Sequence, residues 1–193
     1  MTEAILTLKH KDGRKAKIYQ DDCPESPRSW DNLGTIKTWT RNSDFSDKHA
    51  PHITSEEWEE WSKDHEIAFS AGLDILNYGS SGIKIALNNA LPEDSDGVVF
   101  VTKKDALENF PQKTLNGNVT DESFQRIRDT IKGEIETLQQ WASGDVYGFQ
   151  IFKPETCKHC KHTEEVNEDS CWGFYGLDSI KEELTSQGFK EGN

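Results

Sequence analysis

The chain has 193 residues, 33% of them hydrophobic, and a mean hydropathy of −0.80. This length has room for one core of ordinary size, so we expect residues 1–193 to form a single domain, and the many aromatic residues predict an aromatic-rich core. Lys and Arg number 22 against 35 Asp and Glu, and the resulting net charge of −13 disfavours direct binding to nucleic acids and anionic membranes.

The sequence also bears on where the protein works. No stretch approaches the roughly 20 apolar residues that a membrane span requires, and the start of the chain has neither the basic nor the apolar region of a signal peptide. We therefore expect a cytoplasmic protein. Four cysteines in a chain of this size are too few for a disulfide framework, and in a reducing compartment clustered cysteines indicate metal ligands or catalysts before crosslinks.

The N-terminal third predicts a hairpin, a loop and a further strand. Ala4–His10 and Arg14–Gln20 have strand character, and the Asp12-Gly13 pair between them suits a tight turn with positive φ. Residues 21–33 are rich in Pro, Asp and Trp and are expected to form a loop. Thr35–Thr40 is β-branched and aromatic enough to form the next strand.

A helix is expected from Thr54 to about Ala71. Its start has the capping-box pattern Thr54-Ser55-Glu56-Glu57, with acidic residues in the first turn. Four residues at helical spacing make one face, and core packing is the more common role for such a face: Trp58, Trp61, His65 and Ala68.

The remaining elements are paired strands between helices. Strands are expected at Leu73–Tyr78, Gly82–Asn88, Gly97–Thr102, Val146–Lys153 and Cys171–Tyr175, and short helices at Lys104–Asn109 and Asp178–Ser186. The clearest helix opens at Thr120 and ends near Gly144, with Phe124, Ile127, Ile131, Ile135, Leu138 and Trp141 along one face. This order predicts an α+β fold, in which helices pack mainly on one face of an antiparallel or mixed sheet.

Residues 154–171 form a Cys/His-rich loop within the expected last hairpin. Two thiolates two residues apart, a third thiolate and an imidazole can bind one tetrahedral zinc ion, and the expected ligands are Cys157, Cys160, His162 and Cys171. His159 is the alternative fourth ligand. A disulfide, free thiols or redox work by Cys157 and Cys160 remain alternatives, and Cys23 is too remote in sequence to assign.

A second group of polar residues lies in the Asp21–Asn32 loop. It has two interpretations, a metal or acid–base site and an ordered structural loop, and both involve Asp22, Glu25, Arg28, Trp30, Asp31 and Asn32. We favour the structural loop, in which Arg28 pairs with a carboxylate and Trp30 anchors the loop in the core. The alternative is a metal-dependent hydrolase that uses Asp31, Asp22 or Glu25 with a divalent ion.

An acidic helix surface is the expected contact for a basic partner protein. Its residues are Glu56, Glu57, Glu59, Glu60 and Asp64. The chain has no Gly-x-Gly-x-x-Gly, Walker, His-Glu-x-x-His or Gly-x-Ser-x-Gly motif, and residues 93–97 lack the repeating ligands of a calcium loop. These absences lower the expectation of an enzyme without removing it.

Three blocks of the sequence resemble a widespread group of uncharacterised proteins encoded by bacteriophages and prophages. The blocks are Ser26–Thr35, Gly144–Phe149 and Cys171–Gly176. The resemblance implies a phage setting rather than a reaction, and hence the cytoplasm of a host cell. The chain departs from the group at Ser80-Ser81-Gly82, where members carry His-Ser-Gly, so a site built on that His in relatives would be damaged here.

Together these features favour a phage-type accessory protein that binds and inhibits or modulates a host or defence protein. Its acidic surfaces would compete for the partner's nucleic-acid site. The alternatives are the metal-dependent hydrolase described above and a virion or scaffold component.

Overall fold

The computed structural model describes residues 3–39, 45–79, 82–88, 90, 92–111, 114–115 and 118–191. The chain divides into two compact units, unit 1 of Met1–Glu25 and Gly144–Asn193 and unit 2 of Ser26–Ser143. Each unit has its own sheet and its own buried cluster. The chain length suggested a single core, whereas the described residues form a separate buried cluster in each unit. Unit 1 is built from two segments far apart in the sequence. Its junctions with unit 2 fall between Glu25 and Ser26, within the Pro24–Ser29 run that contains two Pro and two Ser, and between Ser143 and Gly144.

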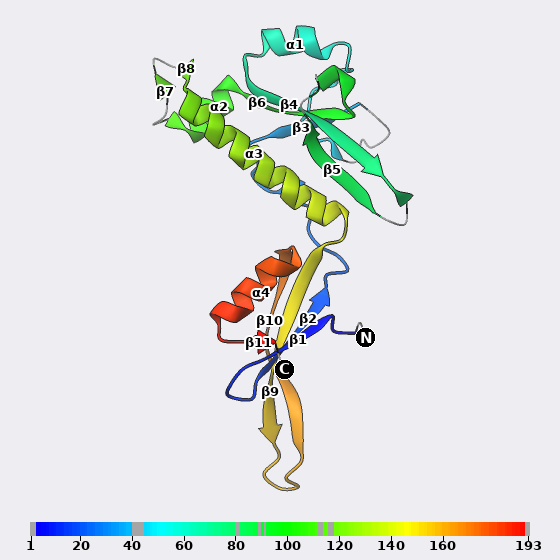
Figure 1. Ribbon diagram of the computed structural model, residues 1–193, viewed down its shortest axis with the longest axis vertical. Coiled ribbons are helices and arrows are strands. Elements are labelled where there is room, and N and C mark those ends of the chain that lie inside the picture. The colour runs from blue at the N-terminus through cyan, green and yellow to red at the C-terminus, as the bar shows by residue number, and fades with distance from the viewer. Residues whose placement is uncertain are drawn as a thin grey trace. The chain divides into compact units, whose positions relative to one another are not determined.

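Unit 1 contains a five-stranded antiparallel sheet with the order β10-β9-β2-β1-β11 (Figure 1). Its strands are β1 (Leu6–Lys9), β2 (Lys15–Gln20), β9 (Val146–Thr156), β10 (Thr163–Tyr175) and β11 (Lys190–Glu191). The predicted hairpin of β1 and β2 is confirmed, and Gly13 has the positive φ of 95° that its turn requires. The expected loop at 154–171 is instead mostly strand, because β9 and β10 pair out to Thr156 and Thr163.

One face of this sheet packs on α4 (Leu177–Ser186). The buried cluster comprises Leu8, Ala16, Ile18, Phe149, Ile151, Ile180, Leu184 and Phe189. Because strand side chains alternate, the residues between these on β2 point to the opposite face: Lys15, Lys17 and Tyr19. The helix thus covers the apolar face of the sheet, and the other face carries polar and aromatic side chains.

Unit 2 contains a four-stranded antiparallel sheet with the order β3-β6-β4-β5. Its strands are β3 (Thr35–Thr38), β6 (Gly97–Thr102), β4 (Ile67–Asn77) and β5 (Ile83–Asn88). The helix α3 (Asp121–Ala142) covers one face with the predicted residues Ile127, Ile131, Ile135 and Leu138, all buried. A tryptophan cluster covers the other face, where Trp58 packs on Val98 and Phe100. Helices therefore contact both faces of this sheet.

Smaller elements complete unit 2. They are the turns η1 (Pro27–Ser29) and η4 (Pro92–Asp94), α2 (Lys103–Asn109), and a ribbon of β7 (Thr114–Leu115) and β8 (Asn118–Val119). Thr40, the last residue of the strand expected at 35–40, lies outside the described residues. So do Ser80 and Ser81, where the sequence departs from the phage-encoded group.

The helix expected at 54–71 is shorter than predicted. α1 spans Trp58–Asp64, and the chain turns at Glu66, which has a φ of 47°, before β4 begins at Ile67. The backbone from Ile67 onward pairs with β6, so sheet pairing replaces the helical periodicity that continued through Ala68. The core role expected for Trp58 is confirmed, since its side chain is buried.

The predicted α+β class with antiparallel sheets is confirmed. Among the described residues, none of the helices is long and apolar enough to cross a membrane.

Candidate functional site

Three of the expected zinc ligands lie in the tight turn that joins β9 to β10. The amide of Cys157 donates to the carbonyl of His162 at 2.8 Å, and the amide of Lys161 donates to the carbonyl of Cys157 at 3.0 Å. Lys161 adopts a left-handed conformation with a φ of 60°, which closes the turn. Cys157, Cys160 and His162 therefore share a six-residue turn, and all three are exposed.

Cys171 does not lie at this turn. It pairs with Phe149, whereas the last pair before the turn joins Thr156 to Thr163. Seven strand positions separate the two pairs, or roughly 23 Å at about 3.3 Å per residue. The structure thus separates Cys171 from the other expected ligands. Within the described part of the chain, no group of three or more His, Cys, Asp or Glu side chains is placed to hold a metal ion.

The Cys157 sulfur accepts hydrogen bonds within this turn. The backbone amides of Cys160 and His159 donate to it, the Cys160 side chain also hydrogen-bonds to it, and together these contacts lower the pKa of the Cys157 thiol. The preceding Pro154-Glu155-Thr156 segment does not lead into a helix, whose N-terminus is the usual environment of a low-pKa thiol. A single helix-like turn supplies the amides instead.

The expected partner-binding residues lie at α1 and just before it, and they are exposed. Three of them are already engaged locally, and hydrogen bonds from its own backbone, Thr54 and Ser55 lower the pKa of Glu56. Glu59 forms an ion pair with Lys63 at 2.6 Å, and the Glu57 carboxylate accepts the Thr54 amide at 2.8 Å. Glu56, Glu60 and Asp64 complete the acidic surface, and its role in partner binding stays a prediction.

The loop at 21–32 is organised by Arg28. Its Nε and Nη2 donate to the two oxygens of Asp47 at 2.9 and 2.6 Å, and Nη2 also donates to the carbonyl of Gly34 at 2.5 Å. The Glu134 carboxylate accepts the amides of Leu33 and Gly34 at 2.7 and 3.1 Å. Burial raises the pKa of Glu134, against these hydrogen bonds and the Arg28 charge, which lower it. The predicted pairing of Arg28 with a carboxylate is confirmed.

Trp30 does not anchor this loop in the core, as we had expected, because it is 46% exposed. Pro27 is the buried residue of η1, and Asn32 donates to the carbonyls of Pro27 and Trp30 at 2.8 and 3.0 Å. The geometry of η1 directs the Trp30 indole toward solvent, and the Pro27 ring occupies the buried position instead.

The carboxylates proposed for a hydrolase fall in different units. Asp22 and Glu25 belong to unit 1, and the carbonyl of Glu25 accepts the Tyr175 hydroxyl at 2.5 Å. Asp31 belongs to unit 2, where it lines a hollow of about 480 Å³ with His49, Asp105 and other polar residues.

Sequence reasoning missed the feature that we regard as the candidate site, the open face of the sheet in unit 1. A hollow of about 620 Å³ lies on this face. Its lining residues come from β2, the segment after it, β9 and β10: Lys17, Tyr19, Gln20, Asp21, Asp22, Cys23, Gln150, Phe152 and Trp172. We call this surface the open face.

Trp172 and Tyr19 form an aromatic platform on the open face. Their rings are stacked at 6.4 Å between centroids with 29° between planes, and Trp172 is 46% exposed. The indole lies against Gly148, where a Cβ atom would collide with it. A register shift between Cys171 and Phe174 places Trp172 and Gly173 in a bulge, and such bulges redirect side chains. The platform is therefore held in place before any ligand arrives.

The two lysines of the open face share one carboxylate, which neutralises only half of their charge. Lys15 and Lys17 each lie 2.7 Å from an oxygen of Glu165, and their hydrogen bonds lower the pKa of Glu165 to about 2. The Lys17 ammonium also lies 4.5 Å from the centre of the Phe152 ring. Asp21 and Asp22 add two negative charges beside the hollow to the one positive charge that this group retains, so a ligand at the platform meets aromatic rings, carboxylates and the Lys17 ammonium.

One sequence pattern could have revealed this face. The Lys15-Ala16-Lys17-Ile18-Tyr19 run alternates strictly between the core and the opposite side, so it places two ammonium groups and a phenol in one row. The partner ring of Trp172 comes from the far end of the chain, and no local pattern links it to Tyr19.

Comparisons with known proteins identify no relative: no family model, no curated protein and no solved structure matches this chain.

Proposed function

We propose that this chain is a protein-binding module whose open face accepts a basic segment of a partner protein. An Arg or Lys side chain of the partner lies over the Tyr19–Trp172 platform, with Asp21 and Asp22 beside it. The partner is a host or defence protein, in keeping with the resemblance to phage-encoded proteins.

The stacked pair of half-buried Tyr19 and exposed Trp172 is the observation that carries this proposal. An aromatic face attracts cations through its quadrupole, most strongly in Trp, and a carboxylate nearby adds to that attraction. The platform is also fixed in advance by Gly148, so little side-chain freedom is lost on binding.

Charge decides between a cationic ligand and the other ligands that stack on aromatic rings. A nucleobase could stack on the same platform, but its phosphates would meet Asp21, Asp22 and a chain of net charge −13. A basic peptide gains from both features. In the partner, that basic segment is the kind of surface that binds nucleic acid, so this protein would occupy it competitively.

Fluorescence anisotropy with labelled peptides tests the proposal. An Arg- and Lys-rich peptide should bind the full chain at moderate salt, whereas a neutral peptide of equal length should not. Trp172→Ala should weaken binding about tenfold, the size expected for a desolvated cation–π contact. Asp22→Asn should weaken binding and reduce its salt dependence.

Trp30→Ala is the matched control, because Trp30 is equally exposed but lies in unit 2. It should leave peptide affinity unchanged. The proposal is wrong if a single-stranded oligonucleotide binds more tightly than the basic peptide, if no basic peptide binds, or if Trp30→Ala and Trp172→Ala lower the affinity equally.

A further inference from the structure

The β9–β10 hairpin extends beyond the sheet to which it belongs (Figure 1). The last pair between β2 and β9 joins Lys15 to Phe152, and past it β9 and β10 pair only with each other in the described structure. Every residue from Lys153 to Glu165 is exposed. This projecting segment therefore has no apolar core, and isolated two-stranded hairpins are marginally stable in water.

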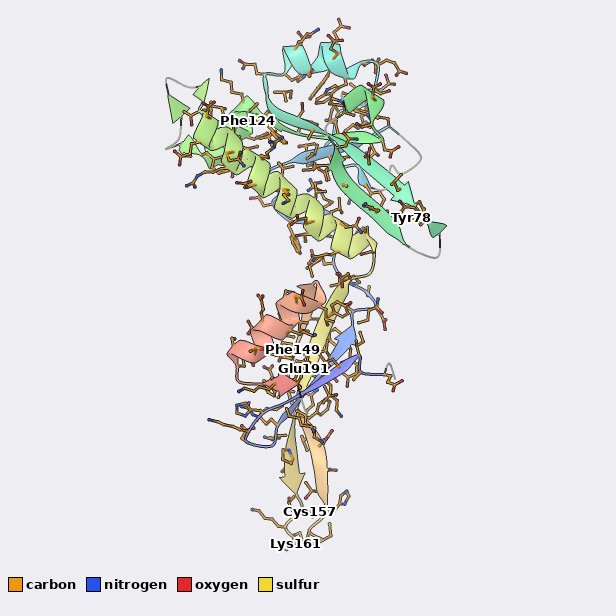
Figure 2. All side chains as sticks on the ribbon, in the orientation of Figure 1. Tyr78, Phe124, Phe149, Cys157, Lys161 and Glu191 are labelled. Atoms are coloured by element: carbon orange, nitrogen blue, oxygen red, sulfur yellow. The ribbon has the colours of Figure 1, made fainter. Side chains whose placement is uncertain are left out.

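Two sulfur atoms lie together at the end of this segment. Figure 2 shows Cys157 and Lys161 at the tip of the hairpin. The Cys157 sulfur contacts the Cys160 side chain and accepts the amides of His159 and Cys160. Two cysteines separated by two residues on a tight turn form half of a tetrahedral zinc site. The turn, closed by the Cys157–His162 and Lys161–Cys157 backbone hydrogen bonds, thus presents two thiols at the exposed end of the hairpin.

One chain does not complete a zinc site at this tip. Structural zinc requires four ligands, and sulfur is the commonest. Cys171 lies roughly 23 Å away along the strands at about 3.3 Å per residue, and the described residues offer no group of three or more metal-binding side chains. The exposed end position leaves both thiols open to ligands from another molecule.

We propose that two copies of this chain share one zinc ion at their hairpin tips, with Cys157 and Cys160 of each copy as the four thiolate ligands. Each thiol releases its proton to solvent as it binds. The inference is independent of the proposed peptide site, which lies on different residues.

Charge at the tip suits this assembly. A zinc ion with four thiolates carries a net charge of about −2. Lys158 and Lys161 lie in the same turn, so two copies bring four ammonium groups to the centre. The Glu155–Glu164 pair beside the turn offsets these lysines, so residues 155–164 carry no net formal charge in chains that each carry −13 overall.

Zinc titration of the reduced full chain, with mass by analytical ultracentrifugation and zinc by elemental analysis, tests the proposal. We expect about one zinc ion per two chains, a dimer with zinc, and a monomer after chelation. Cobalt substitution should give the absorption of tetrahedral thiolate coordination. Cys157→Ser or Cys160→Ser should abolish both the dimer and the cobalt spectrum.

Cys171→Ser is the matched control on the same hairpin and should leave zinc content and dimerisation unchanged. His162→Ala should also leave the dimer intact, because the proposed site needs no imidazole. One zinc ion per monomeric chain, loss of the dimer in Cys171→Ser or His162→Ala, or no zinc binding by the reduced protein would each overturn the shared site.

Discussion

Arg28 and Asp47 form a two-point ion pair, with nitrogen–oxygen distances of 2.9 and 2.6 Å between the guanidinium and the carboxylate. Their side chains are only 11% and 4% exposed. Asp47 also accepts the Ile36 amide at 2.8 Å, so the pair ties η1 to the start of β3. This contact gives the arginine of the Ser26–Thr35 block a structural role.

Arg28→Lys should therefore destabilise unit 2. A lysine cannot make the two parallel hydrogen bonds, and a poorly paired buried Asp47 should cost about 3 kcal/mol of unfolding free energy. Urea denaturation monitored by tryptophan fluorescence measures the loss. Lys63→Gln, which removes the exposed Lys63–Glu59 pair, should cost less than about 0.5 kcal/mol. Equal losses in the two variants would contradict this account of Arg28.

Gly148→Ala should displace Trp172 without removing any side chain from the core. The new methyl group would occupy the space of the indole, so the ring must leave the sheet and separate from Tyr19. Indole NMR shifts and acrylamide quenching would detect the displacement. Basic-peptide affinity should fall by about as much as in Trp172→Ala, close to tenfold. An unchanged affinity would show that the ring position is irrelevant to binding.

Gly133→Ala should stabilise the protein. Gly133 lies within α3, and a Cβ atom added there would meet no atom within 4 Å. Alanine should raise the unfolding free energy by roughly 0.5–1 kcal/mol, because glycine loses more backbone entropy in a helix. Thermal denaturation by circular dichroism measures the gain. A loss of stability would mean that α3 requires the glycine for a contact not seen here.

Because of Glu165, the unfolding free energy should decrease as the pH falls into the acid range. Its pKa falls from about 4.5 to about 2 in the folded state, so its pairing with Lys15 and Lys17 contributes fully above pH 4.5. The contribution is lost as the pH falls toward 2. It should stay below about 1 kcal/mol, because the carboxylate is partly exposed and screened by solvent.

Glu165→Gln should consequently be less stable than the parent at pH 6, and the difference should vanish near pH 2. Chemical denaturation at several pH values measures the convergence, and the carboxyl ¹³C shift of Glu165 reports its pKa directly. A difference that stays constant with pH would rule out the ion pairs as its source.

Local patterns in the sequence were enough to predict several elements. The Ile127, Ile131 and Ile135 spacing defined α3, and Asp12-Gly13 marked the turn of the first hairpin, because in both cases neighbours along the chain set the structure. The end of α1 could not be predicted in this way. Ile67 and Phe69 are as compatible with a helix face as with a strand, and only pairing with β6 decides between them.

The candidate site could not be predicted from local sequence patterns either, because it too depends on pairing between distant strands. Tyr19 and Trp172 are neighbours because β2 and β10 both flank β9, a relationship set by sheet order rather than by spacing. The extension of β9 and β10 was also hidden, since Glu164, Glu165 and Glu168 look like loop residues when no partner strand is known. The Cys157 and Cys160 pair was visible, but the register that separates Cys171 from it was not.

β10 is an edge strand, and edge strands are templates for aggregation when they are long, flat and apolar. Here the edge carries Glu164, Glu165, Glu168 and Asp169, and the register shift between Asn167 and Asp169 interrupts its regular pairing. Charge and irregularity together oppose the addition of another molecule's strand along this 13-residue element. The acidic run thus opposes amyloid-like stacking of a long, exposed hairpin.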